Sequence, residues 1–268
     1  MRNVTISVIQ LENKLFDKNA NLLKADGLIR QAAAKGAKMI CLPELFVTGY
    51  NLNAFGDRIY ELGGPTITHM RALAKELGVY IIAPIAMLMR TTRPLENNAV
   101  VIDDEGEVIG TYSKNHLFGD EPKYFTANGE YPVFDTKYGK IGIMICCDNN
   151  FPARILALGG AELIFMPAAW RVQEADLWKL LISSHACENN VFIAAANVFS
   201  RMDDLFLFGH SKIVDPRGRV LRESETEGDD VLVETIDLDS VYEHRACMPS
   251  LKDRHPETYD TFIEPVNV

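Results

Sequence analysis

The chain has 268 residues, of which 47% are hydrophobic and 24% are charged, and it carries a formal net charge of −10. This composition is ordinary for a folded globular protein. The acidic balance, which no basic run offsets, argues against nucleic acid as a partner because phosphate backbones are repelled. No apolar stretch approaches the roughly 20 residues of a membrane-spanning helix, so we expect no membrane partner.

The N-terminal segment and the cysteines indicate the compartment. Residues 1–10 alternate like a strand and lack the apolar region of a signal peptide. The chain has five cysteines, an odd number, and two of them, Cys146 and Cys147, are adjacent. Such a set is unlike a disulfide framework. Free thiols are typical of a reducing compartment, so we predict a cytoplasmic protein.

The first half of the chain alternates between predicted strands and helices. Apolar runs and helical spacing of apolar residues predict, in chain order, a strand at 4–11, a helix at 18–35, a strand at 39–42, a helix at 66–77 and a strand at 79–83. Two further strands, at 98–102 and 107–112, flank the turn sequence Asp104-Glu105-Gly106, which favours a hairpin.

The second half continues the same alternation. We predict a strand at 140–146, a short helix near 154–158, a strand at 163–166, a helix at 177–189, and strands at 191–196, 211–214, 220–223 and 231–236. From about residue 240 the sequence is polar and contains proline, so residues 240–268 are predicted to form an extended C-terminal arm.

An internal repeat favours two related halves. Residues 36–43 (GAKMICLP) match residues 160–167 (GAELIFMP) in pattern, and each segment leads into a second helix and strand. This pattern indicates two similar units, each with a sheet covered by helices. Because no linker of Ser, Gly or Pro separates them, we predict a single α/β domain over residues 1–268.

Three polar residues stand at the ends of predicted core strands: Glu44, Lys114 and Cys146. Cys146 ends a strand and precedes a polar turn and a helix, an arrangement that can present a nucleophile beside free backbone N–H groups. A buried structural cysteine is the alternative. The adjacent Cys147 leaves open which thiol acts, because neighbours on a strand point to opposite faces.

The other two residues allow complementary roles. In an apolar pocket, Glu44 would have a raised pKa and could act as a general base, although a carboxylate past a core strand is often simply exposed. Lys114 is ordinarily a surface charge, but beside a thiolate it could stabilise an oxyanion. A cysteine–histidine hydrolase with His116 as the base is a second interpretation, and a catalytically silent binding module is a third.

These residues lie in motifs that together resemble the nitrilase superfamily of carbon–nitrogen hydrolases. The segments around Glu44 (LPEL), Lys114 (YSKNHL) and Cys146 (ICCD) occur in the order and approximate spacing of that family, and the similarity spans nearly the whole chain. The resemblance implies a four-layer α-β-β-α sandwich with two sheets face to face. It also implies assembly into a homodimer or a higher homo-oligomer.

The resemblance assigns roles residue by residue. The family's Glu-Lys-Cys triad maps onto Glu44, Lys114 and Cys146, and its second glutamate maps onto Glu121. It implies that the first thiol of the pair, Cys146, forms a thioester with the substrate, without a metal or organic cofactor. Tyr124, Cys147, Trp170 and Arg171 are candidate substrate-binding residues, although Trp170 could equally be packing and Arg171 a surface charge.

The residues around the cysteine bear on the substrate. Cys147-Asp148 follows the nucleophile where nitrile-hydrolysing members have Trp-Glu, so we favour an amidase acting on a small aliphatic amide. An N-carbamoyl amidohydrolase and a nitrilase are the alternatives. Ala153 stands where the family usually has an acidic residue, and the segment 151–160 is shorter than the usual helix. Both departures leave the substrate's acyl and amine parts open.

Overall fold

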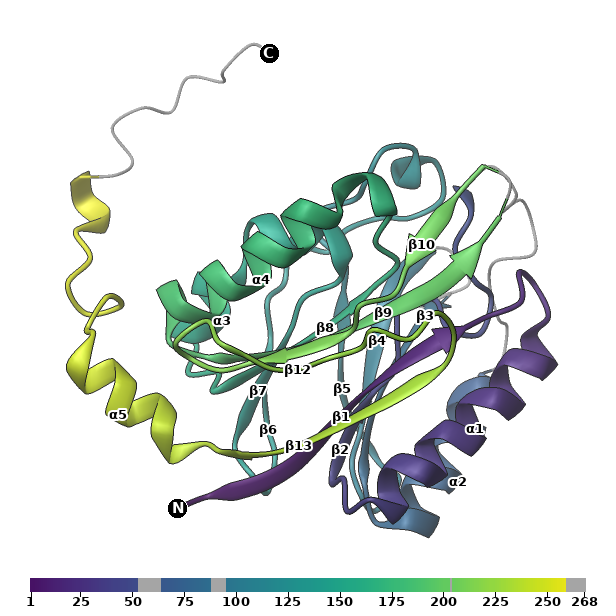
Figure 1. Ribbon diagram of the computed structural model, residues 1–268, viewed down its shortest axis with the longest axis horizontal. Coiled ribbons are helices and arrows are strands. Elements are labelled where there is room, and N and C mark those ends of the chain that lie inside the picture. The colour runs from purple at the N-terminus through teal and green to yellow at the C-terminus, as the bar shows by residue number, and fades with distance from the viewer. Residues whose placement is uncertain (53–63, 88–94, 203, 259–268) are drawn as a thin grey trace.

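The computed structural model describes residues 1–52, 64–87, 95–202 and 204–258. The first half of the chain forms a mixed sheet in the strand order β5-β4-β3-β2-β1, with β13 added on β1 (Figure 1). Its strands are β1 (Asn3–Glu12), β2 (Met39–Cys41), β3 (Tyr80–Met87), β4 (Glu96–Ile102), β5 (Val108–Ser113) and β13 (Asp230–Asp237). Two helices, α1 (Lys18–Ala34) and α2 (Pro65–Leu77), cover one face of this sheet.

The second half repeats this arrangement. Its sheet runs β9-β8-β7-β6, with β10 and β11 paired to β9 and with β12 paired to β11. The strands are β6 (Val133–Asp135), β7 (Lys140–Ile143), β8 (Leu163–Ala168), β9 (Phe192–Arg201), β10 (Phe206–Phe208), β11 (Lys212–Val214) and β12 (Val220–Glu223). Helices α3 (Ala153–Leu158) and α4 (Ala175–Asn189) pack on its outer face. A short parallel pairing of β1 with β9 joins the two halves.

Side-chain alternation explains why both faces of these strands are apolar. On β1, Ile6 and Val8 point into the core shared by the two sheets, whereas Ile9 and Leu11 point toward α1 and α2. Strands covered on both faces read as continuous apolar runs, which is how they appear in the sequence. The predicted four-layer α-β-β-α sandwich with two related halves is confirmed.

Local sequence signals set the helix ends. The side chain of Asp17 caps α1 by accepting a hydrogen bond from the backbone N–H of Ala20 at 3.1 Å. Helix α2 begins with Pro65 in its first turn and ends at Gly78, whose φ of 62° is the left-handed conformation that glycine tolerates. No helix in the described ranges is long and apolar enough to cross a membrane.

Two predictions of local structure require correction. The strand predicted at 140–146 ends at Ile143, and Cys146 instead opens a single 3₁₀ turn, Cys146–Asn150. The segment from residue 240, predicted to be extended, begins with helix α5 (Asp239–Cys247). This helix buries only Val241, so its sequence lacks the apolar periodicity by which a helix is recognised. Other 3₁₀ turns in the described ranges are η3 (Glu121–Lys123), η5 (Val172–Glu174) and η6 (Pro256–Thr258).

Candidate active site

Buried charged side chains meet where strands of the two sheets end. Glu44 follows β2, Lys114 follows β5, and Glu121 opens the turn η3. All three side chains are fully buried. The ammonium Nζ of Lys114 lies 2.9 Å from Glu44 Oε1 and 2.8 Å from Glu121 Oε1, so the lysine bridges the two carboxylates. A buried charge is tolerated when it is paired and hydrogen-bonded in this way.

The charges act strongly on one another. Burial alone would lower the pKa of Lys114, but the carboxylates of Glu44 and Glu121 outweigh burial and hold that pKa well above its ordinary value. Lys114 therefore stays an ammonium at neutral pH. For Glu121, burial raises the pKa, and the charge of Lys114 opposes this effect only in part.

Further hydrogen bonds fix both carboxylates. Asn97 Nδ2 donates to Glu44 Oε1 at 2.7 Å, and the backbone N–H of Ala169 donates to Glu44 Oε2 at 2.8 Å. Glu121 accepts hydrogen bonds from the Tyr50 hydroxyl at 2.9 Å and from the backbone N–H of Phe118 at 2.7 Å. Each oxygen of the two carboxylates thus has a donor, which leaves these side chains little freedom to rotate.

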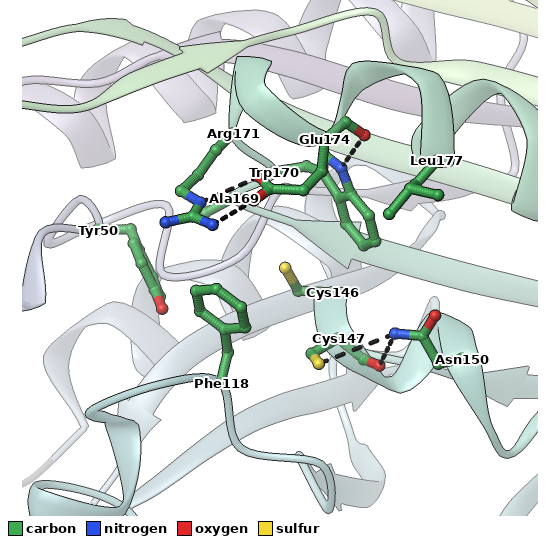
Figure 2. A pocket seen from close by; sticks show the side chains of 10 residues that line it. All are labelled: Tyr50, Phe118, Cys146, Cys147, Asn150, Ala169, Trp170, Arg171, Glu174 and Leu177. Carbon is green, nitrogen blue, oxygen red and sulfur yellow. Dashed lines mark hydrogen bonds and ion pairs between the residues drawn. The ribbon is translucent and has the colours of Figure 1, made fainter. Parts of the chain in front are cut away.

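Cys146 projects from its turn into a cavity beside these charges (Figure 2). Its backbone has a φ of 49°, a left-handed conformation that is unusual for a residue other than glycine and costs on the order of 1–3 kcal/mol. Burial, together with the nearby charge of Glu44, raises the pKa of its thiol well above the ordinary value, although Lys114 opposes the shift. At neutral pH the resting thiol is therefore protonated, and it needs a base to become a nucleophile.

The cavity is small and mostly apolar. Its volume is about 140 Å³, below the roughly 300–1,000 Å³ of pockets for drug-sized ligands. The described residues that line it, apart from Cys146, are Tyr50, Phe118, Cys147, Asn150, Ala169, Trp170, Arg171, Glu174 and Leu177 (Figure 2). A substrate of few heavy atoms fits such a volume.

The predicted substrate-binding residues do not all meet at this cavity. Cys147, Trp170 and Arg171 line it, but Tyr124 is not among the lining residues, and its hydroxyl donates to the carbonyl of Leu52 at 3.2 Å. Arg171 lies 4.8 Å from the ring centre of Phe118 and is ion-paired with Glu174. Its charge is therefore already balanced by a neighbour.

His116 lies outside the cavity lining. Its ring stacks on Phe151 with centres 4.1 Å apart, and its Nδ1 lies 2.7 Å from Asp148 Oδ1. The charges of Glu44, Lys114 and Glu121 shift the pKa of the Cys146 thiol, and His116 is not one of the principal influences on it. This electrostatic coupling to the thiol, which His116 does not share, is consistent with a glutamate base.

Sequence reasoning missed several residues of the site. Tyr50, Asn97 and the backbone of Ala169 hold the two glutamates, and Asp148 braces the cysteine turn. The sequence signal for them is polar: Glu96, Asn97 and Asn98 open the otherwise apolar strand β4, and all three are buried. Buried amides need partners, so such residues mark a polar site.

The chain is similar to known proteins in sequence and in fold. The carbon–nitrogen hydrolase family matches residues 5–246. The chain is 32% identical to an N-carbamoylputrescine amidase of Solanum tuberosum, over 98% of this chain and 95% of that protein. It is 34% identical to a 2-oxoglutaramate amidase of Bacillus subtilis, over 95% and 99% of the two chains.

A solved structure also resembles the whole molecule. An amidase from Nesterenkonia sp. superposes with a TM-score of 0.84 at 26% identity, over 95% of this chain and 94% of that one. The fold, the buried Glu–Lys–Glu cluster beside a cysteine, and the extent of the sequence match lead to one conclusion. The chain belongs to the carbon–nitrogen hydrolase family, within the nitrilase superfamily.

Proposed function

We propose that the protein is an amidase that hydrolyses a small aliphatic amide through a thioester on Cys146. One observation carries the proposal. The Lys114 ammonium lies between the carboxylates of Glu44 and Glu121, at 2.9 and 2.8 Å, beside a small cavity into which the Cys146 thiol projects. This set provides a nucleophile, a base and a fixed positive charge in one buried site.

The first half-reaction forms the thioester. Glu44 takes the thiol proton as Cys146 Sγ attacks the carbonyl carbon, and the carbonyl π electrons move onto oxygen. Lys114, with a backbone N–H near Cys147, stabilises this oxyanion, and loss of one such donor typically lowers the rate about 10²–10³-fold. The tetrahedral intermediate then collapses, its C–N bond breaks, and Glu44 gives its proton to the leaving ammonia or amine.

The second half-reaction releases the acid. Glu44 takes a proton from water as that water attacks the thioester carbon. When the C–S bond breaks, the Cys146 sulfur leaves with the electron pair and recovers a proton from Glu44. Glu121 holds Lys114 in place through both steps, because its Oε1 accepts a hydrogen bond from Nζ and is itself fixed by Tyr50.

The cavity supports a short, uncharged acyl group. Three aromatic side chains, Tyr50, Phe118 and Trp170, and the aliphatic Leu177 line it. Its charged lining residues, Arg171 and Glu174, are paired with each other. A charged acyl group would have to compete with this existing ion pair, whereas an aliphatic one only displaces water.

A carbamoyl substrate is the second candidate. The relatives that favour it are N-carbamoylputrescine amidases, about one third identical along nearly the whole chain. In this case Cys146 attacks the carbamoyl carbon and expels an amine. Hydrolysis of the carbamoyl thioester then yields carbamic acid, which decomposes to carbon dioxide and ammonia. A nitrile is the third substrate class to be tested.

The exposed surface of helices α3 and α4, which cover the second sheet, supports a homodimer. Large apolar side chains are exposed on α3 and at the start of α4, with exposed fractions of 49% for Ile155 and 64% for Leu180. Others on the same helices or next to them are Phe151, Leu158, Val172 and Leu177. Exposed apolar surface of this kind marks an interaction site, and a second copy of the chain would cover it.

We also retain the prediction of a cytoplasmic enzyme, which the free state of all five cysteines supports.

The decisive experiment follows both products and the cysteine. The purified protein is incubated with short amides, N-carbamoyl amines and nitriles while ammonia, amine and carbon dioxide release are measured, and the intact protein is analysed by mass spectrometry. We expect ammonia from short amides and an acyl adduct on Cys146 that Cys146→Ala lacks. An adduct on Cys147, or turnover that survives Cys146→Ala, would contradict the proposal. Carbon dioxide release from carbamoyl compounds alone would select the second candidate.

A further inference from the structure

Asp148 has no part in the chemical steps above, yet its carboxylate is a centre of hydrogen bonding. It is fully buried, two residues after Cys146. Its Oδ2 accepts hydrogen bonds from the Tyr112 hydroxyl at 2.6 Å and from the backbone N–H of Ile145 at 2.9 Å. Its Oδ1 accepts one from the backbone N–H of His116 at 2.9 Å, and His116 Nδ1 lies 2.7 Å away on the same oxygen.

These donors come from two separate segments. Tyr112 lies two residues before Lys114, and His116 lies two residues after it. Ile145 directly precedes Cys146. One carboxylate therefore joins the segment that carries the Lys114 ammonium to the turn that carries the Cys146 thiol.

The same residue closes the turn around the cysteine. Asp148 Oδ2 accepts from the backbone N–H of Ile145, and the backbone N–H of Asp148 donates to the carbonyl of Ile145 at 3.0 Å. Cys146 lies inside this loop, in its left-handed conformation with a φ of 49°. A strained backbone of this kind persists only where its surroundings fix it, and the hydrogen bonds of Asp148 supply that constraint.

We propose that Asp148 is a positioning residue, which holds the Cys146 thiol at the correct place and angle relative to Lys114. This assignment rests on the roles proposed above for Cys146 and Lys114. Burial and the charge of Asp148 raise the pKa of the Tyr112 hydroxyl well above its ordinary value, so that hydroxyl remains a donor over the working pH range.

The substitution Asp148→Asn keeps the shape of the side chain but removes half of its accepting capacity. If the amide nitrogen replaces Oδ2, it faces the N–H of Ile145, and if it replaces Oδ1, it faces the N–H of His116. Either orientation leaves a backbone donor without an acceptor, so the turn must shift. A displacement of about 1 Å at a reacting group lowers the rate about 10²-fold, which is the loss of kcat we expect.

Smaller changes test the same contact with less risk to folding. Tyr112→Phe removes one hydrogen bond to Asp148 and leaves both segments otherwise intact. Tyr131→Phe is the matched control, because that ring lies near Tyr112, with centres 6.4 Å apart, and Tyr131 does not line the cavity. We expect kcat to fall about tenfold in Tyr112→Phe and to be unchanged in Tyr131→Phe, with KM within about threefold of wild type in both.

The experiment measures kcat, KM, the folded fraction and the rate at which iodoacetamide alkylates Cys146. A positioning role predicts that kcat and alkylation per folded molecule fall while KM is maintained. An unchanged kcat per folded molecule in Asp148→Asn would show that the inference is wrong. If Asp148→Asn does not fold, the same result in Tyr112→Phe would show it. Activity that persists in Cys146→Ala would overturn the proposed function itself, so the two failures can be told apart.

Discussion

The Lys114–Glu121 contact offers a test of the buried charge cluster. Glu121→Gln keeps the size of the side chain but replaces a carboxylate that accepts hydrogen bonds from Lys114, Tyr50 and the backbone of Phe118. A glutamine has one acceptor oxygen. Its oxygen can therefore accept from either Lys114 or the N–H of Phe118, and the other donor loses its hydrogen bond to this side chain in a buried site.

The loss of stability expected in Glu121→Gln follows from the distance between the two charges. With unit charges 2.8 Å apart and an effective dielectric constant of about 20, the Lys114–Glu121 attraction is about 6 kcal/mol. Desolvation of the carboxylate offsets part of this attraction, and removal of one partner from a buried pair typically costs about 3–5 kcal/mol. The glutamine amide retains one hydrogen bond, and Glu44 still pairs with the lysine. We therefore expect the free energy of unfolding to fall by about 3 kcal/mol, at the lower end of this range.

The assay combines urea unfolding with steady-state kinetics. Glu225→Gln removes an exposed carboxylate and serves as the control. The free energy of unfolding should fall by about 3 kcal/mol in Glu121→Gln, with kcat lowered about 10²-fold because Lys114 is no longer held toward the oxyanion. A variant as stable as Glu225→Gln, with wild-type kcat, would refute the assignment of Glu121 as the residue that holds Lys114.

Three further predictions concern the thiol, the cavity and the apolar face. Burial, the largest cause of the raised pKa of the Cys146 thiol, remains when Glu44→Gln removes the general base. Cys146 in that variant should therefore be alkylated more slowly at pH 7 than the exposed Cys187 and should react faster as the pH rises above 9, which peptide mapping measures; faster reaction at pH 7 would contradict this. Cys147→Phe should lower kcat/KM about tenfold more for isobutyramide than for formamide, since the ring fills the cavity; equal losses would exclude a lining role. Leu180→Lys should yield monomers by light scattering, whereas Leu23→Lys on α1 should not; an unchanged mass would place the interface elsewhere.

Much of the fold could be predicted because its strands and helices carry strong local signals. The apolar runs and the helical periodicity predict the main elements, and the ordered motifs point to Glu44, Lys114 and Cys146. The single-domain organisation stays a prediction. Helix α5 was missed because it contributes one residue to the core, so its apolar pattern is too weak to read.

The supporting residues of the site could not be predicted in the same way. Asn97 lies 53 residues from Glu44 along the chain, and the N–H of Ala169 lies 125 residues from it. Their functions exist only because strand pairing brings these segments together. A backbone N–H has no sequence signature at all, since every residue except proline provides one.

The pairing of β1 with β13 has a consequence for biosynthesis. Asn3 lies opposite Asp237 in this ladder, so β1 is synthesised long before this neighbour. At about 5–20 residues per second, that strand waits roughly 12–47 s on the ribosome with one edge open. An unpaired apolar edge favours aggregation during this interval, so the nascent chain should depend on chaperones until β13 emerges.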